Sequence, residues 1–118
     1  MANSKRIVYQ KPSCTTCRKA KALLQDLRID FASHDLDKER LSESELDQLI
    51  GVRDYKGFLN TRNELYRSRN MSEHPPSRSE ALKLMAKEPN LIRRPLLVSG
   101  SQIIIGFDED AYRKLSRT

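Results

Sequence analysis

The chain has 118 residues, the length of one ordinary domain, and a formal net charge of +6. No apolar run approaches the roughly 20 residues of a membrane span, and the start MANSKRIVYQ lacks the apolar core of a secretory signal. We therefore expect a cytoplasmic protein with no membrane association. Because no long Lys/Arg block occurs, we favour a small anionic substrate or an acidic protein partner over direct binding to nucleic acid.

The first third of the chain predicts a strand, a helix and a second strand. Residues 6–10 (RIVYQ) are β-branched and aromatic, as strands prefer. Residues 15–28 place apolar side chains at helical spacing, namely Ala20, Leu23, Leu24 and Leu27. Residues 29–36 alternate imperfectly and predict the second strand. A helical crossover of this length favours parallel pairing of the two strands.

Helices dominate the prediction for the middle of the chain. Residues 42–50 begin with a capping-box pattern and are followed by Gly51, a suitable C-cap. Residues 51–60 have no regular pattern. Two further helices are predicted, a short one at 61–69 and a longer one at 77–89.

A hairpin and a helix are predicted for the last part. Residues 95–107 hold two apolar runs split by Ser99-Gly100-Ser101. Residues 108–115 predict a helix with acidic side chains in its first turn, where the helix dipole favours them. The order β-α-β, a helical insertion at about 40–90, then β-β-α is that of the thioredoxin-like fold. We expect one α/β domain over 1–118 with a four-stranded mixed sheet.

The two cysteines of the chain stand three positions apart in KPSCTTCRKAKALL, at the predicted start of a helix. Unpaired N–H groups and the dipole of a helix N-terminus favour a thiolate over a thiol. Arg18, Lys19 and Lys21 add positive charge nearby. Cys14 would then be the nucleophile and Cys17 the resolving thiol that releases a mixed disulfide.

Two other uses of these cysteines are a metal site and simple packing. A structural zinc takes four ligands, and the only histidines, His34 and His74, lack finger spacing, so we expect no metal site. Buried cysteines can also act as small apolar packing residues. A CxxC beside a β-α-β pattern in a cytosolic chain favours redox or nucleophilic use.

A second candidate for the same site lies in NLIRRPLLV. Pro95 stands at the first position of an apolar strand, where proline is tolerated. In thioredoxin-like folds a cis proline at this place lies beside the active-site cysteine, although a cis bond cannot be read from sequence. Arg94 would then direct a guanidinium toward Cys14 and bind anions. The alternative is that Arg93 and Arg94 are solvated loop charges.

Four segments, PSCTTCRKA, FLNTRNELYR, LIRRPLLV and IIIGFDEDAYRKL, resemble the ArsC family in order and spacing. This family includes glutaredoxin-linked arsenate reductases, Spx transcriptional regulators and small YffB-like proteins that are thought to be glutathione-dependent thiol reductases. In its arsenate reductases three arginines bind the oxyanion. The resemblance matches Arg94 to one of them but places Asn60 and Gly106 at the other two, with Arg62 two residues after Asn60.

The resemblance and the residues together predict a thiol-disulfide oxidoreductase without a bound cofactor. Its electrons would come from glutathione, thioredoxin or glutaredoxin. The substrate-binding residues would be Arg94, Pro95, Arg62, Asn60 and Arg18. The alternative is an Spx-like redox switch that binds the RNA polymerase α subunit, although Asp54 stands where the regulators have a glycine important for that contact. Arsenate reduction comes third, because two of its arginines are missing or displaced.

Overall fold

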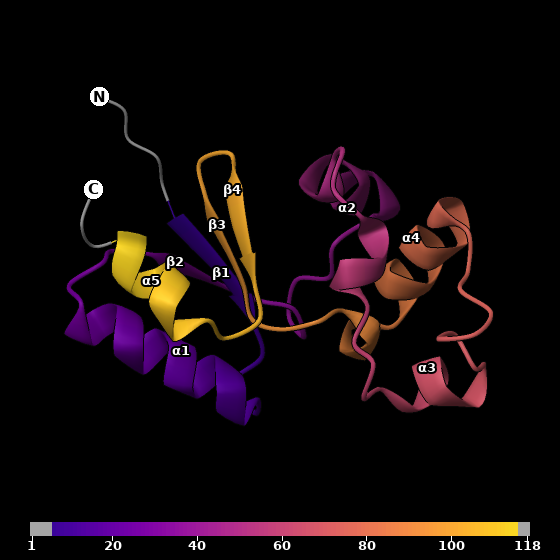
Figure 1. The fold of residues 1–118 in the computed structure, drawn as a ribbon, viewed down its shortest axis with the longest axis horizontal. Coiled ribbons are helices and arrows are strands. Elements are labelled where there is room, and N and C mark those ends of the chain that lie inside the picture. The colour runs from indigo at the N-terminus through magenta and orange to yellow at the C-terminus, as the bar shows by residue number, and fades with distance from the viewer. Residues whose placement is uncertain (1–5, 116–118) are drawn as a thin grey trace. The chain divides into compact units, whose positions relative to one another are not determined.

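The computed structural model describes residues 6–115 (Figure 1). Contacts within the chain define two compact units, the first made of Met1–Leu36 and Arg94–Thr118 and the second of Asp37–Arg93. The second unit corresponds to the insertion predicted at about 40–90. That residues 1–118 form a single domain stays a prediction.

The first unit is built on a four-stranded mixed sheet. Its strands are β1 (Arg6–Gln10), β2 (Ala32–Asp35), β3 (Leu96–Ser99) and β4 (Gln102–Ile105), in the order β2-β1-β3-β4. β1 and β2 are parallel, whereas β1–β3 and β3–β4 are antiparallel. With its helices this is the thioredoxin-like α/β fold, and the predicted order, parallel pair and terminal hairpin are confirmed.

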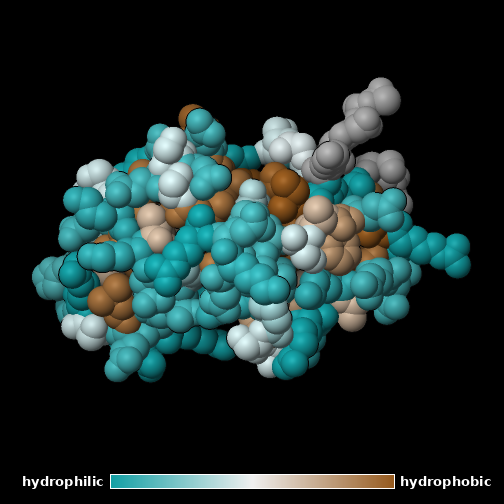
Figure 2. All heavy atoms as spheres, turned by 180° about the vertical axis from the view of Figure 1, so that it is seen from behind, coloured by the Kyte–Doolittle hydropathy of each residue, from teal (hydrophilic) through white to brown (hydrophobic). Residues whose placement is uncertain are grey.

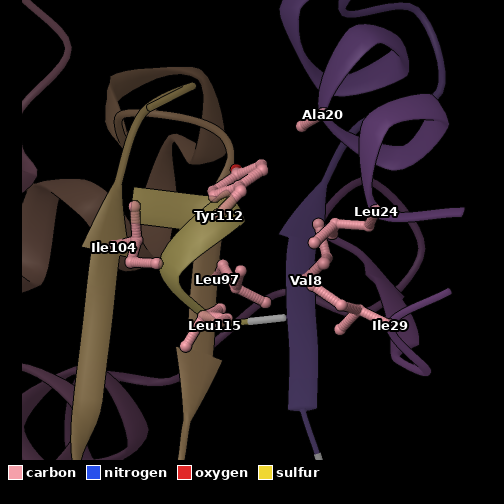
Figure 3. Packing of buried hydrophobic residues seen from close by; sticks show 8 residues of the cluster. All are labelled: Val8, Ala20, Leu24, Ile29, Leu97, Ile104, Tyr112 and Leu115. Carbon is pink, nitrogen blue, oxygen red and sulfur yellow. The ribbon is translucent and has the colours of Figure 1, made fainter. Parts of the chain in front are cut away.

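One face of this sheet carries the core of the first unit (Figure 3). Val8, Leu97 and Ile104 are direct neighbours across β1, β3 and β4 and form a row of buried side chains. Helices α1 (Thr15–Asp26) and α5 (Glu109–Leu115) both pack against this row. Each fully buried apolar side chain contributes about 1.5–3 kcal/mol. This packing holds the start of α1 at the end of β1.

The first helix and second strand are shorter than predicted. α1 ends at Asp26 rather than residue 28, because Leu27 is its C-cap and Arg28 adopts φ 59° in the left-handed region. Arg28 turns the chain toward β2, which starts at Ala32 instead of residue 29. The first half of β2 is exposed, which explains the imperfect alternation of this segment.

The second unit is helical. Its elements are α2 (Glu43–Ile50), η1 (Tyr55–Phe58), α3 (Glu64–Ser68), α4 (Arg78–Lys87) and η2 (Pro89–Leu91). The capping box of α2 is confirmed, since Ser42 Oγ accepts the Glu45 N–H at 3.1 Å and a Glu45 carboxylate oxygen accepts the Ser42 N–H at 2.9 Å. Gly51 is the C-cap of α2, with φ 57°. η1 lies in the segment 51–60, for which no element was predicted.

The face drawn in Figure 2 is mainly hydrophilic, with smaller hydrophobic areas between the polar side chains. A charged fraction of 32% accounts for this appearance. Among residues 6–115 no helix is both long and apolar enough to cross a bilayer.

Candidate thiol site

Cys14 is the N-cap of α1 and follows the short turn that connects β1 to this helix. Its backbone is extended, with φ −83° and ψ 117°, and its carbonyl oxygen accepts the first helical N–H from Arg18 at 3.1 Å. The sulfur itself accepts the backbone N–H of Cys17 at 3.3 Å. This is the place of a capping oxygen, so the sulfur lies at the positive end of the helix dipole.

The surroundings of Cys14 favour its thiolate. Burial acts to raise the pKa of this half-buried thiol, but hydrogen bonds from the side chain and backbone of Cys17 and the charge of Arg94 outweigh it. The net result is a lowered pKa. The cation responsible is Arg94, whereas the exposed Arg18 and Lys19 of the prediction point into solvent from α1.

Cys17 has the opposite environment. Its side chain is fully buried on the inner face of α1. Burial and the neighbouring Cys14 raise its pKa to about 12, against smaller lowering effects from Lys11 and Arg94. Both cysteines are free thiols. One helical turn thus holds a partly exposed thiol with a lowered pKa and a buried, protonated thiol, an arrangement suited to thiol-disulfide exchange.

Arg94 and Pro95 belong to the first unit and lead directly into β3. The Arg94–Pro95 peptide bond is cis, and Pro95 is buried. Arg94 is half-buried, and its charge acts on both Cys14 and Cys17. The Pro95 carbonyl oxygen accepts the Gly106 N–H at 2.8 Å, which fixes this segment to the end of β4. The prediction that Arg94 faces Cys14 therefore agrees with the electrostatics of the site.

The remaining predicted residues lie elsewhere. Arg18 lines a cavity of about 660 Å³ along the outer face of α1, together with Lys21 and Arg28. Asn60 and Arg62 belong to the second unit, before α3. Asn60 shapes its own turn there, since its side-chain oxygen accepts the Arg62 N–H at 3.1 Å and its amide donates to the Asn90 carbonyl at 3.1 Å. Their part in substrate binding stays a prediction.

Two polar residues of the buried layer were not identified from sequence. Gln10 ends β1 and is 3% exposed, and within residues 6–115 its side-chain oxygen has no hydrogen-bond partner. Tyr112 of α5 is fully buried. A glutamine at a strand end and a tyrosine on a helix carry no functional pattern, so only the packing reveals them. The described residues contain no cluster of three or more His, Cys, Asp or Glu side chains suited to a metal.

We expect Cys14 to be alkylated by iodoacetamide at least about tenfold faster than Cys17 at neutral pH, because only thiolates react and the two pKa values are shifted in opposite directions. Mass spectrometry of peptides after timed quenching measures both rates in one sample. Equal labelling, or faster labelling of Cys17, would contradict the assignment of the accessible thiolate to Cys14.

Comparisons with known proteins agree with the resemblance seen in the sequence. The profile described as ArsC family matches residues 9–115. A global transcriptional regulator Spx of Lactiplantibacillus plantarum is 34% identical over 110 residues, covering 92% of this chain and 83% of that protein. The Spx of Streptococcus pneumoniae strain R6 is 32% identical, covering 90% of this chain and 81% of its own.

Solved structures give the same picture. A possible arsenate reductase from Streptococcus mutans superposes with a TM-score of 0.74 at 35% identity, covering 89% of this chain and 92% of that one. A putative ArsC family related protein from Bacteroides fragilis gives a TM-score of 0.83 at 29% identity, covering 94% and 98%. The similarity thus extends over both units of the chain.

Proposed function

The chain belongs to the ArsC family, and we propose that it is a thiol-disulfide oxidoreductase of that family with Cys14 as nucleophile and Cys17 as resolving thiol. The observation that carries the proposal is the paired environment of the two thiols. The Cys14 sulfur accepts a helix N–H at 3.3 Å beside Arg94, and the buried Cys17 stays protonated one turn away.

The reaction uses both sulfurs. The Cys14 thiolate attacks one sulfur of a substrate disulfide, whose other sulfur leaves as a thiol after taking a proton. Cys17 then loses its proton and attacks the Cys14 sulfur, which releases the second substrate thiol and leaves a Cys14–Cys17 disulfide. Two thiols of a donor, glutathione or a reduced thioredoxin or glutaredoxin, supply the two electrons that restore the dithiol. Arg94 holds an anionic end of the substrate or donor.

Arsenate reduction has less support in the site. Of the positions that the resemblance assigns to three arginines, this chain has an arginine only at Arg94. Gly106 adopts φ 80°, in the left-handed region that glycine adopts freely and that residues with a side chain adopt only at a cost in strain. Its N–H and carbonyl oxygen also bond Pro95 and Tyr112. This position is therefore used to fix the backbone rather than to bind an anion.

A redox-switched regulator is the second candidate, because curated relatives at 32–34% identity are named Spx. In this role the same cysteines would control binding to the RNA polymerase α subunit. Against it stands Asp54, at the position of the regulators' glycine. Asp54 is an exposed N-cap of η1, and its carboxylate accepts the Lys56 N–H at 3.0 Å.

One pair of assays separates the two candidates. The first follows reduction of a small disulfide, hydroxyethyl disulfide, with glutathione or with thioredoxin and its reductase. The second tests capture of the polymerase α C-terminal domain by the dithiol and disulfide forms. A reductase turns over in the first assay and captures no α domain. Negligible turnover together with capture that depends on the Cys14–Cys17 disulfide would overturn the proposal in favour of the regulator.

A further inference from the structure

The buried layer beneath the cysteine pair holds a polar group whose hydrogen bonding is incomplete. Tyr112 is fully buried, yet within residues 6–115 its hydroxyl has one hydrogen-bond partner, the carbonyl oxygen of Gly106, at 3.4 Å. O–H···O bonds in proteins usually measure about 2.5–3.0 Å. A buried polar group bonded this weakly calls for an explanation, and a role in redox chemistry is one of the accepted ones.

The fold packs Tyr112 against the helix that carries the resolving thiol. Tyr112 packs with Ala20 and Leu24 of α1 in the core cluster, and Figure 3 shows its ring in the space between α1 and strands β3 and β4. Cys17 lies one turn before Ala20 on the same buried face, roughly 5 Å along the helix axis. Phe107 packs edge-on against the Tyr112 ring, with the ring centroids 5.7 Å apart.

The electrostatics point to the same neighbour. Burial raises the pKa of Tyr112, and the charge of Cys17 raises it further, with a smaller effect from Asp108 at the start of α5. Tyr112 therefore stays a neutral hydroxyl through neutral pH and can only be a hydrogen-bond donor to an anion. The charged groups that act on Cys17 are Cys14 and Arg94, and the backbone of Lys11 already gives it one neutral hydrogen bond. Tyr112 would add a second neutral donor.

We propose that Tyr112 is a positioning residue for Cys17, whose hydroxyl turns from the Gly106 carbonyl to donate a hydrogen bond to the Cys17 sulfur when that sulfur is a thiolate. This role deepens the proposed function and rests on it. Cys17 is a thiolate at two moments, when its proton has left for solvent before it attacks Cys14, and when the electron pair of the broken Cys14–Cys17 bond returns to it as a donor thiolate attacks Cys14. The bond to Gly106 is long, at 3.4 Å, and therefore weak.

Gly106, which the Tyr112 hydroxyl would leave, is also bonded to the segment that contains Arg94 and Pro95. Gly106 accepts from Tyr112 with its carbonyl oxygen and donates to Pro95 with its N–H at 2.8 Å. Pro95 follows Arg94, whose charge acts on both sulfurs. Gly106 is therefore the one residue between the Tyr112 hydroxyl and the backbone of Pro95, which follows Arg94.

The test follows the reduced protein with one equivalent of dithiobis(nitrobenzoate), which reports the two cysteines separately. Attack by Cys14 releases a first thionitrobenzoate and forms a mixed disulfide; attack by Cys17 on Cys14 releases a second. In Tyr112→Phe we expect the first release unchanged and the second about three- to tenfold slower. Loss of a hydrogen bond to a charged group lowers the fraction of Cys17 thiolate by more than this factor. The thiolate that remains is less stabilised and therefore a stronger nucleophile, which offsets part of the loss in rate.

Controls separate a structural effect from a positioning one. Tyr112→Phe keeps the ring that packs on Phe107, and the first release tests the integrity of the site in the same trace. Tyr55→Phe is the matched variant: it loses a hydroxyl that donates to the Pro76 carbonyl at 2.6 Å in the second unit, and both releases should stay at wild-type rates.

The outcomes distinguish the inference from the function beneath it. An unchanged second release in Tyr112→Phe, or an equal slowing of both releases, overturns the role of Tyr112 and leaves the reductase proposal intact. Absence of a second release in the wild-type protein overturns the assignment of Cys17 as the resolving thiol, and the role of Tyr112 with it.

Discussion

Cys14→Ser should reduce disulfide turnover to the uncatalysed rate. The serine hydroxyl stays protonated at neutral pH and is no nucleophile toward a disulfide, whereas the Cys14 thiol has a lowered pKa. Serine is a preferred N-cap residue, and its oxygen can accept the Cys17 N–H that the sulfur accepts now. Helix α1 should therefore keep its start, and thermal unfolding should remain close to wild type.

The matched variant at the second cysteine should behave differently. Cys17→Ala leaves a small apolar side chain in a fully buried position, so the core is retained. With excess glutathione the mixed disulfide at Cys14 can be resolved by a second glutathione, and turnover should fall only severalfold. Reduction of hydroxyethyl disulfide at fixed glutathione measures both variants. Persistent turnover in Cys14→Ser, or complete loss only in Cys17→Ala, would exchange the roles of the two cysteines.

Local patterns in the sequence were sufficient to predict the strands and the helix that hold this site. Three local features place Cys14 at a helix start: the apolar run of β1, the CxxC that follows it, and the helical spacing of Ala20 and Leu24. Such features depend on near neighbours along the chain. The hairpin signal at Gly100 fixes the end of the sheet. These elements carry Cys14 and the segment that ends in Pro95.

The groups that adjust the two thiols could not be predicted in the same way. The nearby cations of α1, Arg18 and Lys19, were expected to lower the pKa of Cys14, but a helix turns them outward and the acting cation is Arg94, 80 positions away in sequence. The charge of Cys17 acts on Tyr112 only because α5 packs against α1. Contacts between elements distant in sequence leave no periodic signal, so only the folded chain discloses them.

Arg94→Ala should slow the first thiol reaction about tenfold at neutral pH and shift its pH profile upward. Arg94 lowers the pKa of Cys14 by its charge and by a hydrogen bond, so the pKa must rise when the side chain is removed. The thiolate fraction at pH 7 then falls, and the rate recovers as pH increases through the new pKa. We expect no larger effect because Cys14 is half-buried and water screens part of the interaction.

Two further variants separate the effect of the Arg94 charge from the effects of its shape and of its neighbour. Arg94→Lys keeps the charge but not the planar fork, so it should restore much of the Cys14 pKa and little of the binding of an anionic substrate. Arg93→Ala removes the adjacent exposed arginine, whose backbone N–H still donates to Phe58, and should leave both rates unchanged. Stopped-flow alkylation between pH 5 and 9 gives the pKa directly. A profile of Arg94→Ala that superposes on wild type would return Arg94 to the class of solvated loop charges, and the helix N-terminus and Cys17 alone would account for the acidic thiol.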